Sequence, residues 1–157
     1  MKIVMSGFVL FAALALTGCS PEADHNQADV TFAQRMIPHH RQALTMSEKL
    51  PADAGEPVAA LARQIQAAQA PEIDRLTGWL KEWGASASGH EGMDHGAPMV
   101  TATRADWLKA MIEHHRGAVT MARDELRDGA HTGARQLAQQ VIDGQEAEIA
   151  TMTGLLG

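Results

Sequence analysis

The segment MIPHHRQALTM spans residues 36–46, and the segment MIEHHRGAVTM spans residues 111–121. The two segments are identical at eight of eleven positions, and each places two adjacent histidines between two methionines. At the helical rotation of about 100° per residue, the methionines, the histidines and the alanine that follows them fall in one stripe. Both segments therefore predict a helix that turns His and Met side chains toward a core.

A second repeat follows each of these segments. LARQIQAAQAPEIDRLTGWL (61–80) and LAQQVIDGQEAEIATMTGLL (137–156) match at nine of twenty positions without a gap. The repeated unit is therefore a helical hairpin, and one hairpin cannot bury its apolar face alone. Two hairpins predict an all-α four-helix bundle, and no alternating strand pattern appears.

Proline, glycine and capping residues predict where the helices begin and end. Asp29 suits the cap of a first helix, and Pro57 suits the first turn of a second helix that stops at Gly84. Thr103 with Asp106 resembles a capping box for a third helix. The predicted helices run over about 29–50, 57–83, 103–129 and 134–156. Repeat one is thus 29–84, the linker 85–102 and repeat two 103–157, which together form a bundle over 29–157.

The first residues have the pattern of an export signal. Lys2 is followed by an apolar stretch too short to span a membrane, and the stretch ends in Leu16-Thr17-Gly18-Cys19. This ending resembles a lipobox, which predicts a signal peptide over 1–18, a lipid on Cys19 and a tether over 19–28. Acyl chains on Cys19 would hold the protein on a membrane surface. An ordinary signal peptide or short anchor with an incidental cysteine is the alternative.

Charge and cysteine content exclude several classes of function. The chain has 13 Lys and Arg against 19 Asp and Glu, for a net charge of −6, so nucleic acid is not an expected partner. Cys19 is the only cysteine. Once it is lipidated, no thiol remains for a disulfide, a thiolate nucleophile or a Cys-type zinc site.

The inward histidines predict a metal site. Burying four imidazoles without a hydrogen-bond partner or a metal costs free energy, whereas a single buried His or Met is usually part of the core. Imidazole with thioether suits Cu(I), and imidazole alone suits Cu(II). His25 and His131 lie in polar segments and are expected to be solvated.

Two amides interrupt the apolar stripes of the second and fourth helices. Counted back from the hairpin turns, Gln69 lies level with His39 and His40, and Gln145 lies level with His114 and His115. A buried amide or carboxylate facing an imidazole fixes its tautomer and orientation.

The linker carries a further group of metal-binding residue types. It has no helical or strand pattern, and His-rich tracts of this kind are a compositional signal for metal. A flexible linker without a fixed site is the alternative reading. The residues of the possible linker site are His90, Met93, His95 and Met99.

Twin M-I-x-H-H-x-x-A-x-x-M segments, each followed by Q-x-x-E-I, resemble the bacterial family catalogued as domain of unknown function 305, over about residues 29–156. The resemblance implies an exported, ferritin-like four-helix bundle, and some members are implicated in binding copper. The implied metal ligands are Met36, His39, His40, Met46, Met111, His114, His115 and Met121. The residues implied to face them are Gln69, Glu72, Gln145 and Glu148.

The chain departs from the family pattern at one point, because QAPEI stands where the second repeat has QEAEI. Pro71 lies inside a predicted helix, where it removes a hydrogen bond to Ala67 and favours a kink. We therefore expect Gln69 and Glu72 to be displaced and the second His pair to bind metal more strongly.

Together these observations predict a lipid-anchored copper-binding protein that sequesters or delivers copper in the cell envelope. Its expected partners are the metal ion, the membrane and other copper-handling proteins of the envelope. Two alternatives remain: a copper-dependent redox enzyme of the cuprous oxidase type, and a metal-free interaction module. The sequence favours a binding protein over an enzyme.

Overall fold

The computed structural model describes residues 24–86 and 102–157, which form four helices and no strand. The helices are α1 (Gln27–Glu48), α2 (Gly55–Glu82), α3 (Arg104–Asp128) and α4 (Thr132–Leu156). The predicted all-α four-helix bundle is confirmed. Within these two ranges, no helix is long and apolar enough to cross a membrane.

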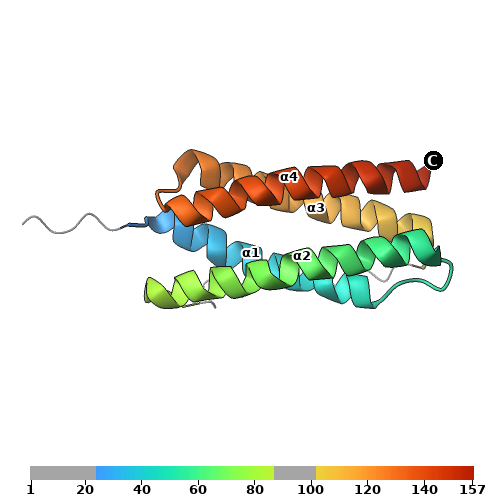
Figure 1. The fold of residues 1–157 in the computed structure, drawn as a ribbon, viewed down its shortest axis with the longest axis horizontal. Coiled ribbons are helices and arrows are strands. Elements are labelled where there is room, and N and C mark those ends of the chain that lie inside the picture. Colours follow the sequence, from blue (N-terminus) through green and yellow to red (C-terminus); the bar gives the residue numbers. More distant parts are fainter. Residues whose placement is uncertain (1–23, 87–101) are drawn as a thin grey trace, which may run out of the picture.

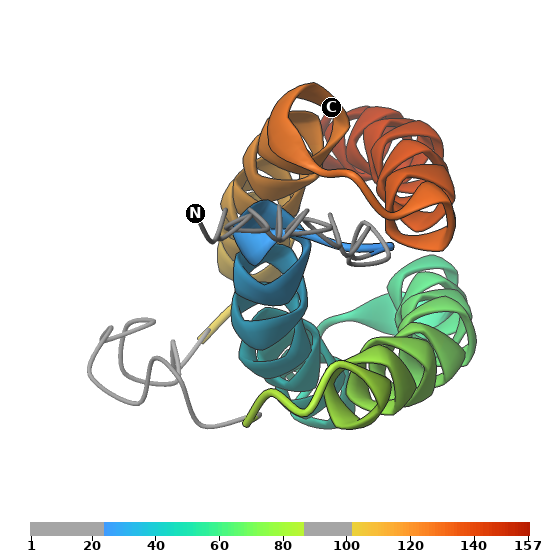
Figure 2. The same cartoon turned by 90° about the vertical axis from the view of Figure 1, so that its left-hand side faces the viewer.

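The bundle consists of two antiparallel hairpins, α1–α2 and α3–α4 (Figure 1). The hairpins meet mainly through α1 and α3, whereas α2 and α4 touch each other little (Figure 2). The chain leaves α2 at one end of the bundle and enters α3 at the other end. The first helices of the two repeats therefore form the central contact, which brings equivalent residues of the repeats close together.

The start of α1 differs from the prediction. Asn26 is the N-cap, and its side chain accepts hydrogen bonds from the backbone N–H groups of Ala28 and Asp29. Asp29 is the third helical residue, and its carboxylate accepts from the Asn26 backbone N–H at 2.6 Å. This reciprocal arrangement is a capping box, so the prediction of Asp29 as the cap was wrong by three residues. Residues 27 and 28 of the predicted tether over 19–28 belong to α1, and its residues 19–23 lie outside the described residues.

The other helix ends agree with the prediction more closely. Gly84 has φ +65°, and Ala85 N–H donates to the Leu80 carbonyl at 2.8 Å, which closes α2 as predicted. The Thr103 hydroxyl accepts from Asp106 N–H at 3.2 Å and caps α3. The fourth helix begins two residues earlier than expected, because His131 caps it by accepting from Ala134 N–H at 3.1 Å.

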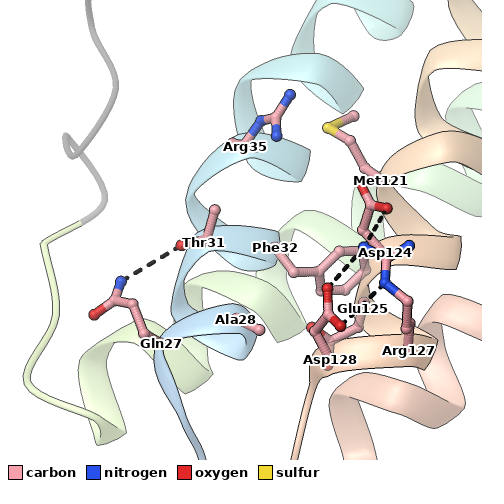
Figure 3. Close-up of a pocket in the computed structure, with 10 residues that line it drawn as sticks. All are labelled: Gln27, Ala28, Thr31, Phe32, Arg35, Met121, Asp124, Glu125, Arg127 and Asp128. Carbon is pink, nitrogen blue, oxygen red and sulfur yellow. Dashed lines mark hydrogen bonds and ion pairs between the residues drawn. The ribbon is translucent and has the colours of Figure 1, made fainter.

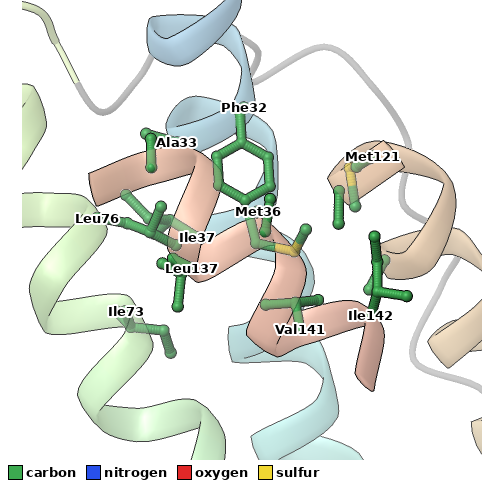
Figure 4. Close-up of a cluster of buried hydrophobic side chains, with 14 of the residues drawn as sticks. Phe32, Ala33, Met36, Ile37, Ile73, Leu76, Met121, Leu137, Val141 and Ile142 are labelled. Atoms are coloured by element: carbon green, nitrogen blue, oxygen red, sulfur yellow. The ribbon is translucent and has the colours of Figure 1, made fainter. Parts of the chain in front are cut away.

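Two hydrophobic clusters fill the bundle, and each contains residues of all four helices. Figure 4 shows the first cluster, in which Phe32, Met36 and Met121 pack on Leu137 and Val141. On every helix a buried polar side chain lies between the parts assigned to the two clusters. These side chains are His39 and His40 on α1, Gln69 on α2, His115 on α3 and Gln145 on α4. The core is thus two apolar layers with a polar layer between them.

Candidate metal centre

Two carboxylate–imidazole pairs belong to the polar layer. His40 Nε2 lies 2.7 Å from Glu72 Oε2, and His115 Nε2 lies 2.8 Å from Glu148 Oε2. Both imidazoles are fully buried, whereas the Glu72 and Glu148 side chains are about one fifth exposed, at 21% and 19%. Each glutamate lies on the second helix of the same hairpin, so each repeat builds its own pair. The pairs fix the ring orientation and, with the proton on Nε2, leave Nδ1 as the ring's lone-pair nitrogen.

Pro71 does not disturb the first of these pairs. The α2 helix is continuous from Gly55 to Glu82, and the contact of His40 with Glu72 is as short as its counterpart in the second repeat. The predicted displacement of Glu72 was therefore wrong. The physical reason is that Pro71 and Ala67 are both exposed, so water can hydrogen-bond the carbonyl that the proline leaves without a helical donor.

The other two histidines of the repeated segments, His39 and His114, lie next to each other where the two hairpins meet. The rings of His39 on α1 and His114 on α3 have centroids 3.7 Å apart. His39 also lies 6.5 Å from His40, and His114 lies 6.2 Å from His115, between ring centroids. The four imidazoles therefore form one continuous row across the centre of the bundle.

The predicted methionines lie on either side of this row. Met36 and Met121 belong to one apolar cluster, and Met46 and Met111 belong to the other. Met36 and Met111 are fully buried, while Met46 and Met121 are 7% and 8% exposed. Because Met36 precedes His40 by four residues and Met111 precedes His115 by four, each thioether lies one helical turn from a buried imidazole.

Several buried polar atoms of this layer have no hydrogen-bond partner among the described residues. They are the Nδ1 atoms of His40 and His115, both amide atoms of Gln69, and the Oε1 atom of Gln145. Buried polar groups are almost always hydrogen-bonded, so such a group calls for a water molecule or an ion. Gln69 and Gln145 are 2% and 4% exposed, as expected for amides that interrupt the inward stripes of α2 and α4.

No group of three or more His, Asp or Glu side chains in the described ranges is arranged to hold one ion. A zinc or iron site built from such ligands is therefore not preformed in this part of the chain. A donor set of one imidazole nitrogen with one or two thioethers still fits the residues present, and it suits Cu(I) rather than a hard cation.

Some predicted site residues lie outside the described ranges. These are the four residues of the possible linker site, His90, Met93, His95 and Met99, and the predicted lipidation site Cys19. Their assignments stay predictions from the sequence.

A cluster of aromatic rings at one end of the bundle was missed by the sequence reading. His25 stacks on Trp83 with centroids 4.7 Å apart, and His131 packs edge-on against Trp79 at 5.1 Å and Trp83 at 5.2 Å. The expectation that His25 and His131 are solvated was wrong, because the C-terminal turn of α2 offers both of them an aromatic surface. The sequence signal that could have predicted this cluster is the pair Trp79 and Trp83, which lie one helical turn apart at the end of α2.

A buried pair of carboxyl groups was missed as well. The Asp29 carboxylate accepts hydrogen bonds from the backbone N–H groups of Ala130 and His131, which ties α1 to the turn between α3 and α4. Burial alone would raise the pKa of Asp29. The hydrogen bond from the adjacent Glu125 carboxyl and those from the backbone N–H groups of Asn26, Ala130 and His131 outweigh burial, so the Asp29 pKa is lowered. Burial, and then the nearby Asp29 carboxylate, raise the pKa of Glu125 to about 9.

Glu125 borders a pocket of about 310 Å³ between the first half of α1 and the end of α3 (Figure 3). Phe32 and Met121 contribute apolar surface to it, and Arg127 forms ion pairs with Asp124 and Asp128 at its edge. The pocket shares Met121 with the predicted metal ligands, but none of the four central histidines lines it.

Comparison with known proteins gives the family. The model of the domain of unknown function DUF305 matches residues 29–106 and 99–156. The chain belongs to the DUF305 family. No curated protein matches the chain.

Solved structures that are similar to this chain have the same fold. A DUF305 fragment from Deinococcus radiodurans is 28% identical with a TM-score of 0.72, over 84% of this chain and 97% of that one. A DUF305 protein from Streptomyces coelicolor, described as a putative secreted protein, is 31% identical with a TM-score of 0.72, over 86% and 94%. CopM in its Cu(II)-bound form is 27% identical with a TM-score of 0.72, over 82% and 95%.

Proposed function

We propose that this DUF305 protein binds copper in the polar layer at the centre of its bundle and sequesters or delivers the ion in the cell envelope. The observation that carries the proposal is the pair of buried imidazoles, His40 and His115. Each has one ring nitrogen held by a glutamate, and each has a buried Nδ1 without a partner among the described residues. Histidines that bind metals are typically oriented in this way, with a carboxylate on the nitrogen opposite the metal.

The neighbouring side chains favour copper among the metals. Met36 supplies a thioether one helical turn from His40, and Met111 supplies one a turn from His115. The second methionine of each segment, Met46 or Met121, lies in the apolar layer on the other side of the histidines. Thioether sulfur is a soft ligand, and with imidazole it favours Cu(I). His39 and His114 add two imidazoles between the two halves, which provides nitrogen ligands for Cu(II).

The solved relatives support copper in particular. CopM is known in Cu(I)-bound, Cu(II)-bound and silver-bound forms as well as an apo form. The Cu(I)-bound form is 29% identical to this chain with a TM-score of 0.70. Silver and Cu(I) are both soft monovalent ions, so the binding of both by a relative agrees with a thioether-rich site.

Export and lipid anchoring are part of the proposal. They rest on the apolar stretch before Leu16-Thr17-Gly18-Cys19 and on the putative secreted relative. A lipid on Cys19 would keep the bundle at the membrane surface, where it would meet copper before the ion reached the cytoplasm.

Titration of Cu(I) under anaerobic conditions, in competition with a chromogenic chelator, tests the proposal. The purified protein should bind copper, and the double variant His40→Ala/His115→Ala should lose most of this binding while circular dichroism still shows the helices. The control is His25→Ala, because His25 precedes α1 at the end of the bundle, away from the central histidines, and also contacts an acidic side chain, that of Asp24. Undiminished binding by the double variant would contradict the proposed ligands.

A further inference from the structure

The two eleven-residue segments differ at three positions, and one of them lies against the site. Gln42 in the first segment is replaced by Gly117 in the second. Gly117 lies in the interior of α3, where glycine is less favourable than alanine because it loses more backbone freedom on folding. A glycine at this position therefore needs a reason other than helix formation.

The reason is the imidazole of His39. A Cβ atom built on Gly117 would lie 3.0 Å from His39 Nε2, and 3.9 Å from Cδ2 and Cε1 of the same ring. Carbon and nitrogen atoms in ordinary van der Waals contact are about 3.5–4.0 Å apart. The His39 ring thus lies so close to Gly117 that a side chain at this position would crowd it.

The same contact lies where the two hairpins meet, at the level of the histidines. His39 and His114 have ring centroids 3.7 Å apart, and α1 with α3 forms the main contact between the hairpins. A methyl group at position 117 would push the His39 ring away or separate α1 from α3 locally. Either movement changes the position of His39 relative to His114.

We propose that Gly117 is a positioning residue of the metal site, which holds the His39 imidazole against His114 by leaving room for it on α3. The expected effect of Gly117 on copper affinity rests on the proposed copper-binding function. The placement of the His39 ring, in contrast, is a property of the metal-free protein.

A matched control exists in the same molecule. Gly144 lies in the interior of α4, and a Cβ atom built on it meets no atom within 4 Å. The equivalent position in the first repeat is already alanine, at Ala68. Gly144→Ala therefore gives the same gain in helix propensity as Gly117→Ala without a contact to the site.

The test compares Gly117→Ala with Gly144→Ala by two measurements. In the metal-free protein, NMR resonances of the His39 and His114 ring nitrogens should shift in Gly117→Ala and stay unchanged in Gly144→Ala. Because His39 and His114 are the proposed Cu(II) ligands, a Cu(II) competition titration is the second measurement, in which Gly117→Ala should bind about tenfold more weakly, the lower end of the loss expected when a metal-binding histidine is misoriented. Unchanged ring resonances in Gly117→Ala, or shifted resonances with wild-type affinity, overturn the proposal.

A double-mutant cycle separates positioning from a general effect on the fold. Once His39 is alanine, the added methyl group has room, so His39→Ala and His39→Ala/Gly117→Ala should bind copper equally. If Gly117→Ala alone loses its helical structure, the double variant should regain it, and failure to regain it contradicts the proposal. If the wild-type protein binds no copper, the proposed function fails, while the ring resonances still decide the role of Gly117.

Discussion

The imidazole rings of His39 and His114, which are equivalent residues of the two repeats, lie with their centroids 3.7 Å apart and their planes inclined by 32°. The two residues come from different hairpins, α1–α2 and α3–α4. The centre of the polar layer is therefore built by both repeats together, whereas the flanking pairs His40–Glu72 and His115–Glu148 are each built within one hairpin.

The first prediction concerns the dependence of each hairpin on the other. Both apolar clusters contain residues of all four helices, so a separate hairpin would expose half of each cluster to water. Residues 24–86 and 102–157, expressed separately, should be molten or oligomeric, with near-ultraviolet circular dichroism largely lost. When mixed, the fragments should recover the spectrum of the intact chain. A monomeric 24–86 fragment with a sharp thermal transition would show that the hairpin is self-sufficient.

The second prediction concerns the two glutamates that orient the buried imidazoles. Glu72→Gln and Glu148→Gln keep the size of the side chain but remove its charge, so each should weaken Cu(I) binding by about 10- to 100-fold. Because the two contacts measure 2.7 and 2.8 Å, the two losses should agree within a factor of about three, or roughly 0.65 kcal/mol. Competition titrations of both variants and of the exposed control Glu146→Gln provide the measurement. A large loss in one variant alone would mean that only one repeat binds the ion.

The third prediction concerns Glu125, which is 1% exposed and has a pKa raised to about 9 from an ordinary value of 4.5. Below about pH 4.5 the carboxyl is neutral in both the folded and the unfolded chain, so it carries no penalty. Between about pH 4.5 and 9 the unfolded chain loses the proton while the folded protein keeps it. The free energy of unfolding therefore falls with rising pH, by at most about 1.4 kcal/mol per pH unit, and levels off above about pH 9.

Glu125→Gln keeps a neutral side chain at every pH and should remove this fall. The variant should be about as stable as the wild type near pH 4.5, and its advantage should grow as the pH rises toward 9. Urea unfolding at pH 5, 7 and 9, followed by circular dichroism, measures the difference, with the exposed Glu113→Gln as the control. Parallel stability profiles of wild type and Glu125→Gln would show that Glu125 does not keep its proton in the folded state.

The fourth prediction concerns Cys19, which lies outside the described residues. If the Leu16–Cys19 tetrapeptide directs lipidation, Cys19→Ser should move the protein from the membrane fraction to the soluble fraction of the envelope. Mass spectrometry of the wild-type protein should show acyl groups on its N-terminal cysteine. Membrane association that survives the substitution unchanged would remove the lipid anchor from the proposal.

The fold follows almost entirely from local features of the sequence. The spacing of Phe32, Met36, His40 and Ala43 on α1 specifies one inward face, and the same spacing recurs on α3. Gly84 and Thr103 mark helix ends through their own backbone or side-chain chemistry, which needs no distant partner. A helix is determined by residues within a few turns of each other, and the duplication shows that two similar hairpins must share one core.

The sequence by itself therefore determined four helices, their pairing into hairpins, and the inward direction of the twin His–Met segments. Only the tertiary structure decided which histidines meet, because His39 and His114 are 75 residues apart and their contact depends on how α1 docks on α3 at Gly117. The same holds for Asp29 beside Glu125 and for His25 and His131 on Trp83. In each case the docking of one helix on another part of the chain fixes the contact, and helical periodicity carries no information about docking. The tertiary structure also decided that Pro71 leaves Glu72 in place, because Pro71 and Ala67 lie on the exposed face of α2 rather than against the core.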